Sequence, residues 1–366
     1  MSILSHPDRW GSIDSRSMKS LLEGFPEQLE AAALAGREVS IEKTGAIRSL
    51  IVTGLGGSAI GGDLVRSIAG PQLRIPLLVN RDYDLPAFAD ARTLVFACSY
   101  SGNTEETISA YRQACEAKSP IVCITSGGQL QAMAQSDGYP VLLLPPGLPP
   151  RAALGYSLLG LLSAMQALQF SPDLGESIGE TVGLMKNLRE RYGSSNPEPA
   201  NPAMALAGSL YGKIVAIYAS NGIMDGAAYR WRSQIAENSK NLAFHHVLPE
   251  MNHNELVGWM YPEEVLKRVG VVFLRDKGDH AQVQRRFDLT RELIADKAGS
   301  LQEVWSEGNS LLARVLSVIY LGDFVSLYLA FLNNVDPTPV HVIDYLKGKL
   351  GGSGQADAGQ GSRSLI

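Results

Sequence analysis

The chain has 366 residues, of which 45% are hydrophobic and 19% charged, so it is long enough to bury a sizeable core in two domains. A formal net charge of -5 and the lack of a long basic run give no electrostatic reason to expect a nucleic acid or a membrane as a partner. The three cysteines show neither metal-ligand spacing nor a disulfide framework, which predicts a cytoplasmic protein without a bound metal.

Short apolar runs alternate with amphipathic stretches through the first half of the chain. The expected strands are Ser49–Thr53, Pro76–Val79, Leu94–Cys98, Pro120–Thr125 and Pro140–Leu144. The expected helices are Ile60–Ala69, Thr104–Ala117, Leu130–Gln135 and, after a proline-rich stop, Arg151–Phe170. This alternation predicts a parallel sheet with helices on both faces.

The second half repeats this architecture without a repeat of sequence. The expected strands are Lys213–Ala219, Leu242–Val247, Val269–Leu274 and Leu301–Ser306. The expected helices are Asp225–Lys240, His280–Lys297, Ser310–Leu332 and Pro339–Leu350. We therefore expect two doubly wound α/β domains, 1–170 and 203–350, with a polar linker at 171–202 and a disordered tail at 351–366.

The stretch Leu311–Leu332 is the longest apolar helix candidate. It contains Arg314, Gly322 and Asp323, which favour burial inside the protein over a position in lipid.

Two loops that follow predicted strands carry the features of an anion site. Gly54–Asp63 follows the first strand, Cys98–Thr107 follows the third, and each loop opens a predicted helix. Backbone N–H groups and the helix dipole favour an anion at such positions. The candidate binding residues are Gly56, Gly57, Ser58, Ser99, Ser101 and Thr104. Two such loops together predict a phosphorylated ligand held from both sides.

The first loop also satisfies a dinucleotide-binding fingerprint through Gly54, Gly56 and Ala59. The acidic residue that such a site needs comes late, as Asp82 after the second strand. A nicotinamide-dependent oxidoreductase therefore stays open as an alternative.

The two loops together resemble the sugar isomerase (SIS) domain, and specifically the bifunctional phosphoglucose/phosphomannose isomerases. The motifs that carry the resemblance are Gly54–Asp63, Ser99–Thr107, Thr125–Gly128, Pro149–Tyr156, Glu237–Lys240, Pro249–Glu255 and Asp336–Pro339 with Lys347. They extend over nearly the whole chain in one order.

The resemblance implies reversible isomerisation of glucose 6-phosphate, and of mannose 6-phosphate, to fructose 6-phosphate through a cis-enediolate. Glu237 matches the base that moves a proton between C1 and C2, and Arg151 matches the cation that stabilises the enediolate. His253 and Lys347 match the groups that open the sugar ring. His245 and His246 compete for the histidine role, but they read as strand residues.

The resemblance further implies a homodimer whose active site takes its histidine from the partner subunit, with a sugar phosphate as substrate and with no metal or redox cofactor. A sugar-phosphate-binding SIS protein without catalysis is the remaining alternative. That class predicts a nucleic-acid-binding appendage or loss of the catalytic residues, and the sequence shows neither.

Overall fold

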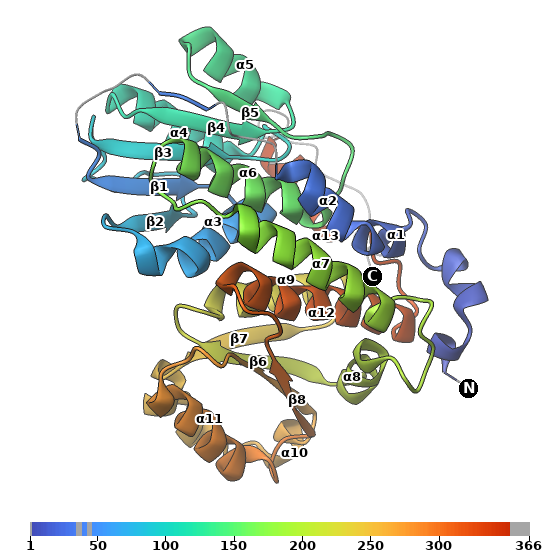
Figure 1. Cartoon of the computed structure of the whole chain (residues 1–366). Coiled ribbons are helices and arrows are strands. Elements are labelled where there is room, and N and C mark those ends of the chain that lie inside the picture. Colours follow the sequence, from blue (N-terminus) through green and yellow to red (C-terminus); the bar gives the residue numbers. More distant parts are fainter. Residues whose placement is uncertain (1, 34–38, 42–45, 352–366) are drawn as a thin grey trace.

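The computed structural model describes residues 2–33, 39–41 and 46–351, so the expected tail lies outside the described residues except for its first position. Short helices precede the first sheet: η1 (Ile3–Ser5), η2 (Pro7–Ser12), α1 (Met18–Glu23) and α2 (Phe25–Ala32). Figure 1 shows two lobes, each built on one sheet, with a layer of helices between them.

The first lobe holds a five-stranded parallel sheet in the order β2-β1-β3-β4-β5. Its strands are β1 (Ser49–Thr53), β2 (Leu77–Asn80), β3 (Thr93–Cys98), β4 (Ile121–Thr125) and β5 (Val141–Leu143). Its helices are α3 (Gly56–Ala69), α4 (Glu105–Glu116), α5 (Gly128–Asp137) and α6 (Leu154–Ala167), with short turns η3 (Gly70–Gln72) and η4 (Pro150–Ala152). Strands β1, β3 and β4 are almost entirely buried, as a parallel sheet covered on both faces requires.

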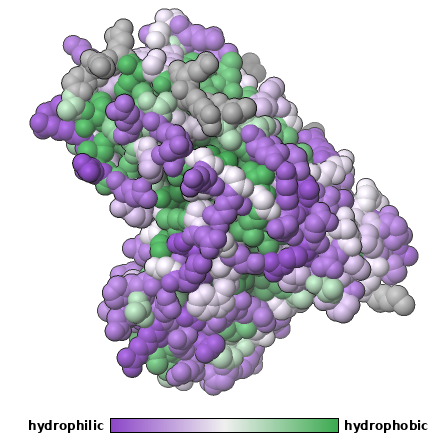
Figure 2. Space-filling view, viewed as in Figure 1, coloured by the Kyte–Doolittle hydropathy of each residue, from purple (hydrophilic) through white to green (hydrophobic). Residues whose placement is uncertain are grey.

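The second lobe holds a four-stranded parallel sheet in the order β7-β6-β8-β9. Its strands are β6 (Ile214–Ser220), β7 (Ala243–Leu248), β8 (Val269–Arg275) and β9 (Ser300–Trp305). Its helices are α8 (Pro202–Leu210), α9 (Asp225–Ser239), η5 (Glu250–His253), η6 (Glu255–Gly258), α10 (Glu263–Leu266) and α11 (Ala281–Ile294). On the face in Figure 2, hydrophilic residues cover most of this lobe.

Helices α7 (Gly175–Tyr192), α9 and α12 (Leu311–Leu332) lie between the two sheets in Figure 1. They pack on α2, α3 and α8 and contribute to the largest hydrophobic core. The last described helix is α13 (His341–Gly351), whose residues 341–350 are all exposed. Helix α12 is long and apolar enough to cross a membrane, but 89% of its apolar window is buried inside the protein. It is thus the central core helix, as expected.

The predicted α/β class with two parallel sheets is confirmed, and each of the nine expected strands is present to within one residue at either end. The structure differs at 171–202, which we expected to be a linker and which contains the 18-residue helix α7. Only one face of α7 is buried, through residues such as Val182, Met185 and Leu188, so its composition is polar overall. The domain limits at 170 and 203 stay a prediction.

The three interruptions of the apolar pattern in α12 each make a specific contact. Arg314 Nε donates to Asp276 Oδ2 at 2.9 Å. Asp323 accepts two hydrogen bonds from the guanidinium of Arg230, and both side chains are buried. At Gly322 the helix passes directly against the ring of Trp231 in α9, so that an added Cβ would lie 2.3 Å from it. The close packing of α12 on α9 therefore requires a glycine.

We expect Gly322→Ala to lower the free energy of unfolding by about 1–3 kcal/mol, because a methyl group has no room against the buried Trp231 ring. Gly183→Ala is the matched control, since Gly183 is exposed in α7 and an added Cβ there meets nothing within 4 Å. This variant gains about 0.5–1 kcal/mol from the better helix propensity of alanine. Urea unfolding measures the free energy of unfolding of both variants. Equal changes in the two would contradict the close packing of Gly322 on Trp231.

Candidate active site

The two predicted anion loops meet at the point where the strand order of the first sheet reverses. Strands β1 and β3 are neighbours, and their connections leave the sheet in opposite directions toward β2 and β4. In open α/β sheets ligands bind at this point, outside the carboxyl ends of the strands. The loops 54–58 and 99–104 lie at these two strand ends.

The hydroxyl groups of the two loops accept and share hydrogen bonds, one of which connects the loops. The backbone N–H of Tyr100 donates to Ser58 Oγ at 3.3 Å, which connects one loop with the other. Ser99 Oγ and Thr104 Oγ1 lie 2.9 Å apart, and Ser99 Oγ also accepts from the backbone N–H of Gly102. The two loops therefore form one polar cradle, which includes the exposed Ser101 at its rim.

A third loop supports the second one from behind. Gly102 has a φ of +69°, and a Cβ there would lie 1.8 Å from the carbonyl oxygen of Gly127. The backbone N–H of Leu130 donates to the Gly102 carbonyl, and that of Gln129 donates to Asn103 Oδ1. Only glycine satisfies both the positive φ and the close approach at position 102.

The start of the first helix needs correction, and two residues of the loops have packing or hydrogen-bonding roles. Helix α3 begins at Gly56, four residues before the expected start, so Gly57 and Ser58 lie in its first turn. Gly62 lets α3 pack closely on the sheet, because an added Cβ would lie 2.9 Å from Val52 of β1. Thr104 is the N-cap residue of α4 by position, but its side chain makes no capping bond and faces Ser99 instead.

Arg151 is buried between the lobes, with only 6% of its surface exposed. It lies in η4, and the backbone of this region is held by the side chain of Gln28, which bonds Ala152 and Gly155. Among the described residues, its guanidinium bonds only to residues that follow the first lobe in sequence, in α9 and after α12. Nε donates to Asn238 Oδ1 at 2.7 Å, and Nη2 donates to the carbonyl oxygens of Pro337 and Thr338, each at 2.7 Å.

Glu237 lies opposite the remaining nitrogen of this guanidinium. Its Oε2 is 3.5 Å from Arg151 Nη1, and its side chain is partly exposed near the end of α9. Burial lowers the pKa of Arg151, and the Glu237 carboxylate acts in the opposite direction. The pair thus combines a fixed cation with an accessible carboxylate.

The first anion loop contacts the turn that carries Arg151. A Cβ added to Gly57 would lie 3.1 Å from the carbonyl oxygen of Pro150 and 3.7 Å from Cα of Arg151. The backbone of the first anion loop is therefore in contact with the turn that carries the cation.

Three residues of the matched motifs, Asn238, Lys240 and Thr338, lie beside Arg151 or Glu237. The sequence alone assigned no function to Asn238 and Lys240. Lys240 Nζ donates to the carbonyl oxygens of Glu237, Asn238 and Asp336, which ties the end of α9 to the C-terminal segment. Burial lowers the pKa of Lys240 to about 8, and the charge of Arg151 acts in the same direction. The hydroxyl of Thr338 is buried without a partner beside Arg151.

The structure does not bring His253 and Lys347 to the Arg151–Glu237 pair within one chain. His253 is exposed at the end of η5, and Lys347 is exposed on α13. Among the described residues, neither side chain makes a hydrogen bond or an ion pair with Arg151 or Glu237. The two assignments stay predictions.

The competing histidines, His245 and His246, lie in β7 and each contacts another side chain. His245 is half-buried with its ring edge against Tyr229, and burial lowers its pKa to about 4. His246 is exposed and pairs with Glu255.

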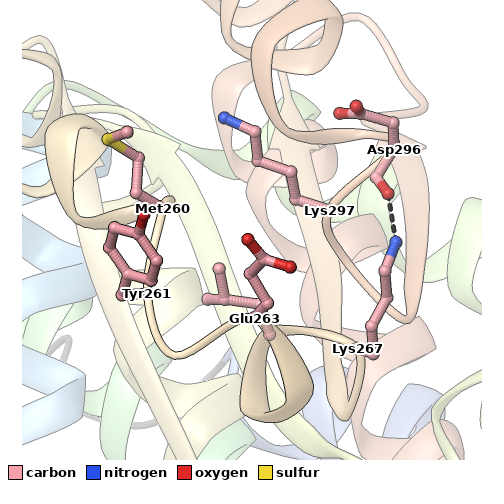
Figure 3. Close-up of a pocket in the computed structure, with 7 residues that line it drawn as sticks. Met260, Tyr261, Glu263, Lys267, Asp296 and Lys297 are labelled. Atoms are coloured by element: carbon pink, nitrogen blue, oxygen red, sulfur yellow. Dashed lines mark hydrogen bonds between the residues drawn. The ribbon is translucent and has the colours of Figure 1, made fainter.

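A separate pocket of about 340 Å³ opens between α10 and the end of α11 (Figure 3). It contains no predicted site residue, and Lys267 there donates to the backbone carbonyl of Asp296. Its lining is Met260, Tyr261, Glu263, Leu266, Lys267, Asp296 and Lys297. This pocket is therefore distinct from the candidate site.

Comparison with known proteins shows the family of this chain. A family model described as the bacterial phospho-glucose isomerase C-terminal SIS domain matches residues 199–350. The bifunctional phosphoglucose/phosphomannose isomerase of Caldicellulosiruptor bescii is 47% identical, over 89% of this chain and 96% of that protein. The protein of the same name from Aquifex aeolicus is 35% identical, over 90% and 97%.

A crystal structure of a hypothetical protein from Thermus thermophilus shares the fold, with a TM-score of 0.69 at 16% identity over 92% of this chain and 91% of that one. The two parallel sheets and the matching family model define a protein of the SIS class. More closely, the chain belongs to the family of bifunctional phosphoglucose/phosphomannose isomerases. This membership selects the isomerase prediction over the nicotinamide alternative.

We expect Ser58→Ala and Thr104→Val each to weaken the binding of inorganic phosphate at least tenfold, because a hydrogen bond to a charged group contributes about 1.5–3 kcal/mol. The phosphate-dependent rise in Tm, followed by calorimetry, measures this. Ser209→Ala is the control, since its hydroxyl bonds only the Leu206 carbonyl in α8. An unchanged phosphate response in both cradle variants would show that the cradle is not the anion site.

Proposed function

We propose that the chain interconverts glucose 6-phosphate with fructose 6-phosphate, and mannose 6-phosphate with fructose 6-phosphate, through a cis-enediolate. The observation that carries the proposal is the Arg151–Glu237 pair, in which Arg151 lies on the turn that contacts the hydroxyl-lined cradle at Gly57. The cradle binds the phosphate, and this remote binding energy holds the reacting carbons beside the carboxylate.

Glu237 is the base of the reaction. It takes the proton from C2 of the open-chain aldose while the C2–H electron pair moves to form the C1–C2 double bond, which leaves the negative charge on the C1 oxygen. The same carboxylic acid returns the proton to C1. The hydroxyl proton moves from the C2 oxygen to the C1 oxygen, and the C2 oxygen becomes the ketose carbonyl. The reverse sequence converts the ketose to the aldose.

Arg151 stabilises the charge that develops on the enediolate oxygens. Its guanidinium is buried and already held by three hydrogen bonds, so it needs little reorganisation during the reaction. A planar cation also matches two oxygens on a planar carbon pair.

His253 and Lys347 exchange protons with the ring oxygen and O1 during ring opening. The exposed position of His253 on η5 supports a role toward a second subunit, because one chain leaves it away from Glu237. We infer a homodimer in which the partner subunit's His253 completes the site. Three free cysteines support a cytoplasmic setting.

Glu237→Gln is expected to lower kcat about 10²–10⁴-fold in both directions, because the amide cannot accept the carbon-bound proton. A coupled assay with fructose 6-phosphate measures the loss. Binding of inorganic phosphate stays within about twofold, since Glu237 does not line the cradle.

Glu263→Gln, a change of an exposed carboxylate in the pocket of Figure 3, is the matched control and keeps wild-type turnover. Turnover by Glu237→Gln at the rate of this control would refute the role of Glu237.

Mixing two inactive variants tests the shared site. Glu237→Gln and His253→Ala dimers are expected to recover about a quarter of wild-type activity after subunit exchange, because half of the dimers become mixed and each mixed dimer has one intact site. Mass spectrometry of the native complexes verifies the exchange. Absence of recovery among verified mixed dimers would place His253 in the site of its own chain or outside the reaction.

A further inference from the structure

The guanidinium of Arg151 has one nitrogen left for chemistry. Nε is used by Asn238 and Nη2 by two backbone carbonyls, so Nη1 is the nitrogen that faces the Glu237 carboxylate. The Nε contact is the only hydrogen bond between this guanidinium and a side chain among the described residues. The direction of Nη1 therefore depends on where Asn238 holds Nε.

Asn238 is itself fixed from the other side. It is fully buried at 0% exposure, and its Nδ2 donates to Ser326 Oγ of α12 at 2.9 Å. Ser326 Oγ in turn donates to the carbonyl oxygen of Asp323 at 2.7 Å. With its amide nitrogen engaged in this way, Asn238 presents its oxygen, and not its nitrogen, to Arg151.

The chain of bonds continues to a buried ion pair. Asp323 also binds Arg230, and Arg230 Nη2 donates to the backbone carbonyl of Arg151 at 2.9 Å. The backbone and the side chain of Arg151 are thus both held by residues of α9, which are themselves fixed by α12. Such a network is rigid because every charged or amide group in it would be costly to leave without a partner.

We propose that Asn238 is a positioning residue of the isomerase, which aims Nη1 of Arg151 at the enediolate. The proposal rests on the proposed function. The base and the residue that aims the cation are consecutive on α9, so the end of one helix sets both Glu237 and Arg151. Any displacement of this helix end moves the carboxylate and the guanidinium together.

Loss of Asn238 is expected to affect the reaction step and not substrate binding. Asn238 does not line the cradle, so its loss leaves phosphate binding in place. It releases the guanidinium that stabilises the enediolate, and a misplacement of about 1 Å in such a group costs up to 10²-fold in rate. The effect therefore falls on kcat and on the affinity for an enediolate mimic.

The test compares Asn238→Ala with Asn333→Ala in the full chain. Asn333 is the matched control, because its Nδ2 also ties α12 to the end of α9, at the Ser239 carbonyl, without contact to Arg151. We expect Asn238→Ala to lower kcat about 10–100-fold with KM within about threefold, and Asn333→Ala to keep kcat within about twofold.

Ligand binding gives a second readout. A five-carbon sugar-acid phosphate, whose carboxylate mimics the enediolate, is expected to bind Asn238→Ala at least tenfold more weakly, whereas inorganic phosphate binds unchanged. Equal kcat losses in Asn238→Ala and Asn333→Ala, or a rise in KM alone, would overturn the proposal.

The Ser326→Ala variant and the activity of the wild-type chain distinguish a failure of this inference from a failure to fold or of the proposed function. If Asn238→Ala does not fold, Ser326→Ala replaces it, since it removes only the hydroxyl that holds the Asn238 amide. Its kcat must then fall more than that of Asn333→Ala, and an equal kcat would overturn the proposal. A wild-type chain that converts no sugar phosphate would overturn the proposed function and this inference together, whereas an active wild type with an unimpaired Asn238→Ala overturns the inference alone.

Discussion

A guanidinium buried between two lobes is the constraint on which the rest of this structure depends. Arg151 is carried by the first lobe, but in the part of the chain that the structure describes its side-chain hydrogen bonds all go to α9 and the segment after α12. Removing an arginine from water is costly unless its donors are satisfied, so the lobes must keep the arrangement that supplies Asn238 and the two carbonyls. The same arrangement brings the Glu237 carboxylate to Nη1 of Arg151, whose turn contacts the cradle at Gly57. Folding energy and catalytic geometry therefore rest on the same contacts.

The two lobes share a strand order but offer different chemistry at the carboxyl ends of their strands. The first lobe ends its strands in glycines and hydroxyls, which suit an anion. At the corresponding edge of the second sheet, Asp276 is fully buried and bonded to Ser306 and Arg314. A buried carboxylate there opposes a second phosphate. The second lobe instead contributes α9, which brings the base to the anion held by the first, and this division explains why one site needs two similar domains.

Local pattern in the sequence was enough to predict the strands and the two anion loops, because apolar runs and the turn residues between them act over a few positions. Helix α7 was missed since it buries only one face. The start of α3 was missed because its glycine-rich first turns resemble a loop, although Gly62 packs against Val52. The Arg151–Glu237 contact joins residues far apart in the chain, and only the family resemblance pointed to it. The role of Asn238 depends on how α9 and α12 pack, which no local pattern encodes.

The most direct test of the central claim is the turnover of fructose 6-phosphate by Arg151→Lys. Lysine keeps the positive charge but cannot reach Asn238, Pro337 and Thr338 together while presenting a further nitrogen to Glu237. The account predicts a loss of kcat of at least about 10²-fold together with a lower Tm, since chemistry and lobe packing share this side chain. Turnover within about threefold of the wild-type rate would contradict it, because charge alone would then suffice.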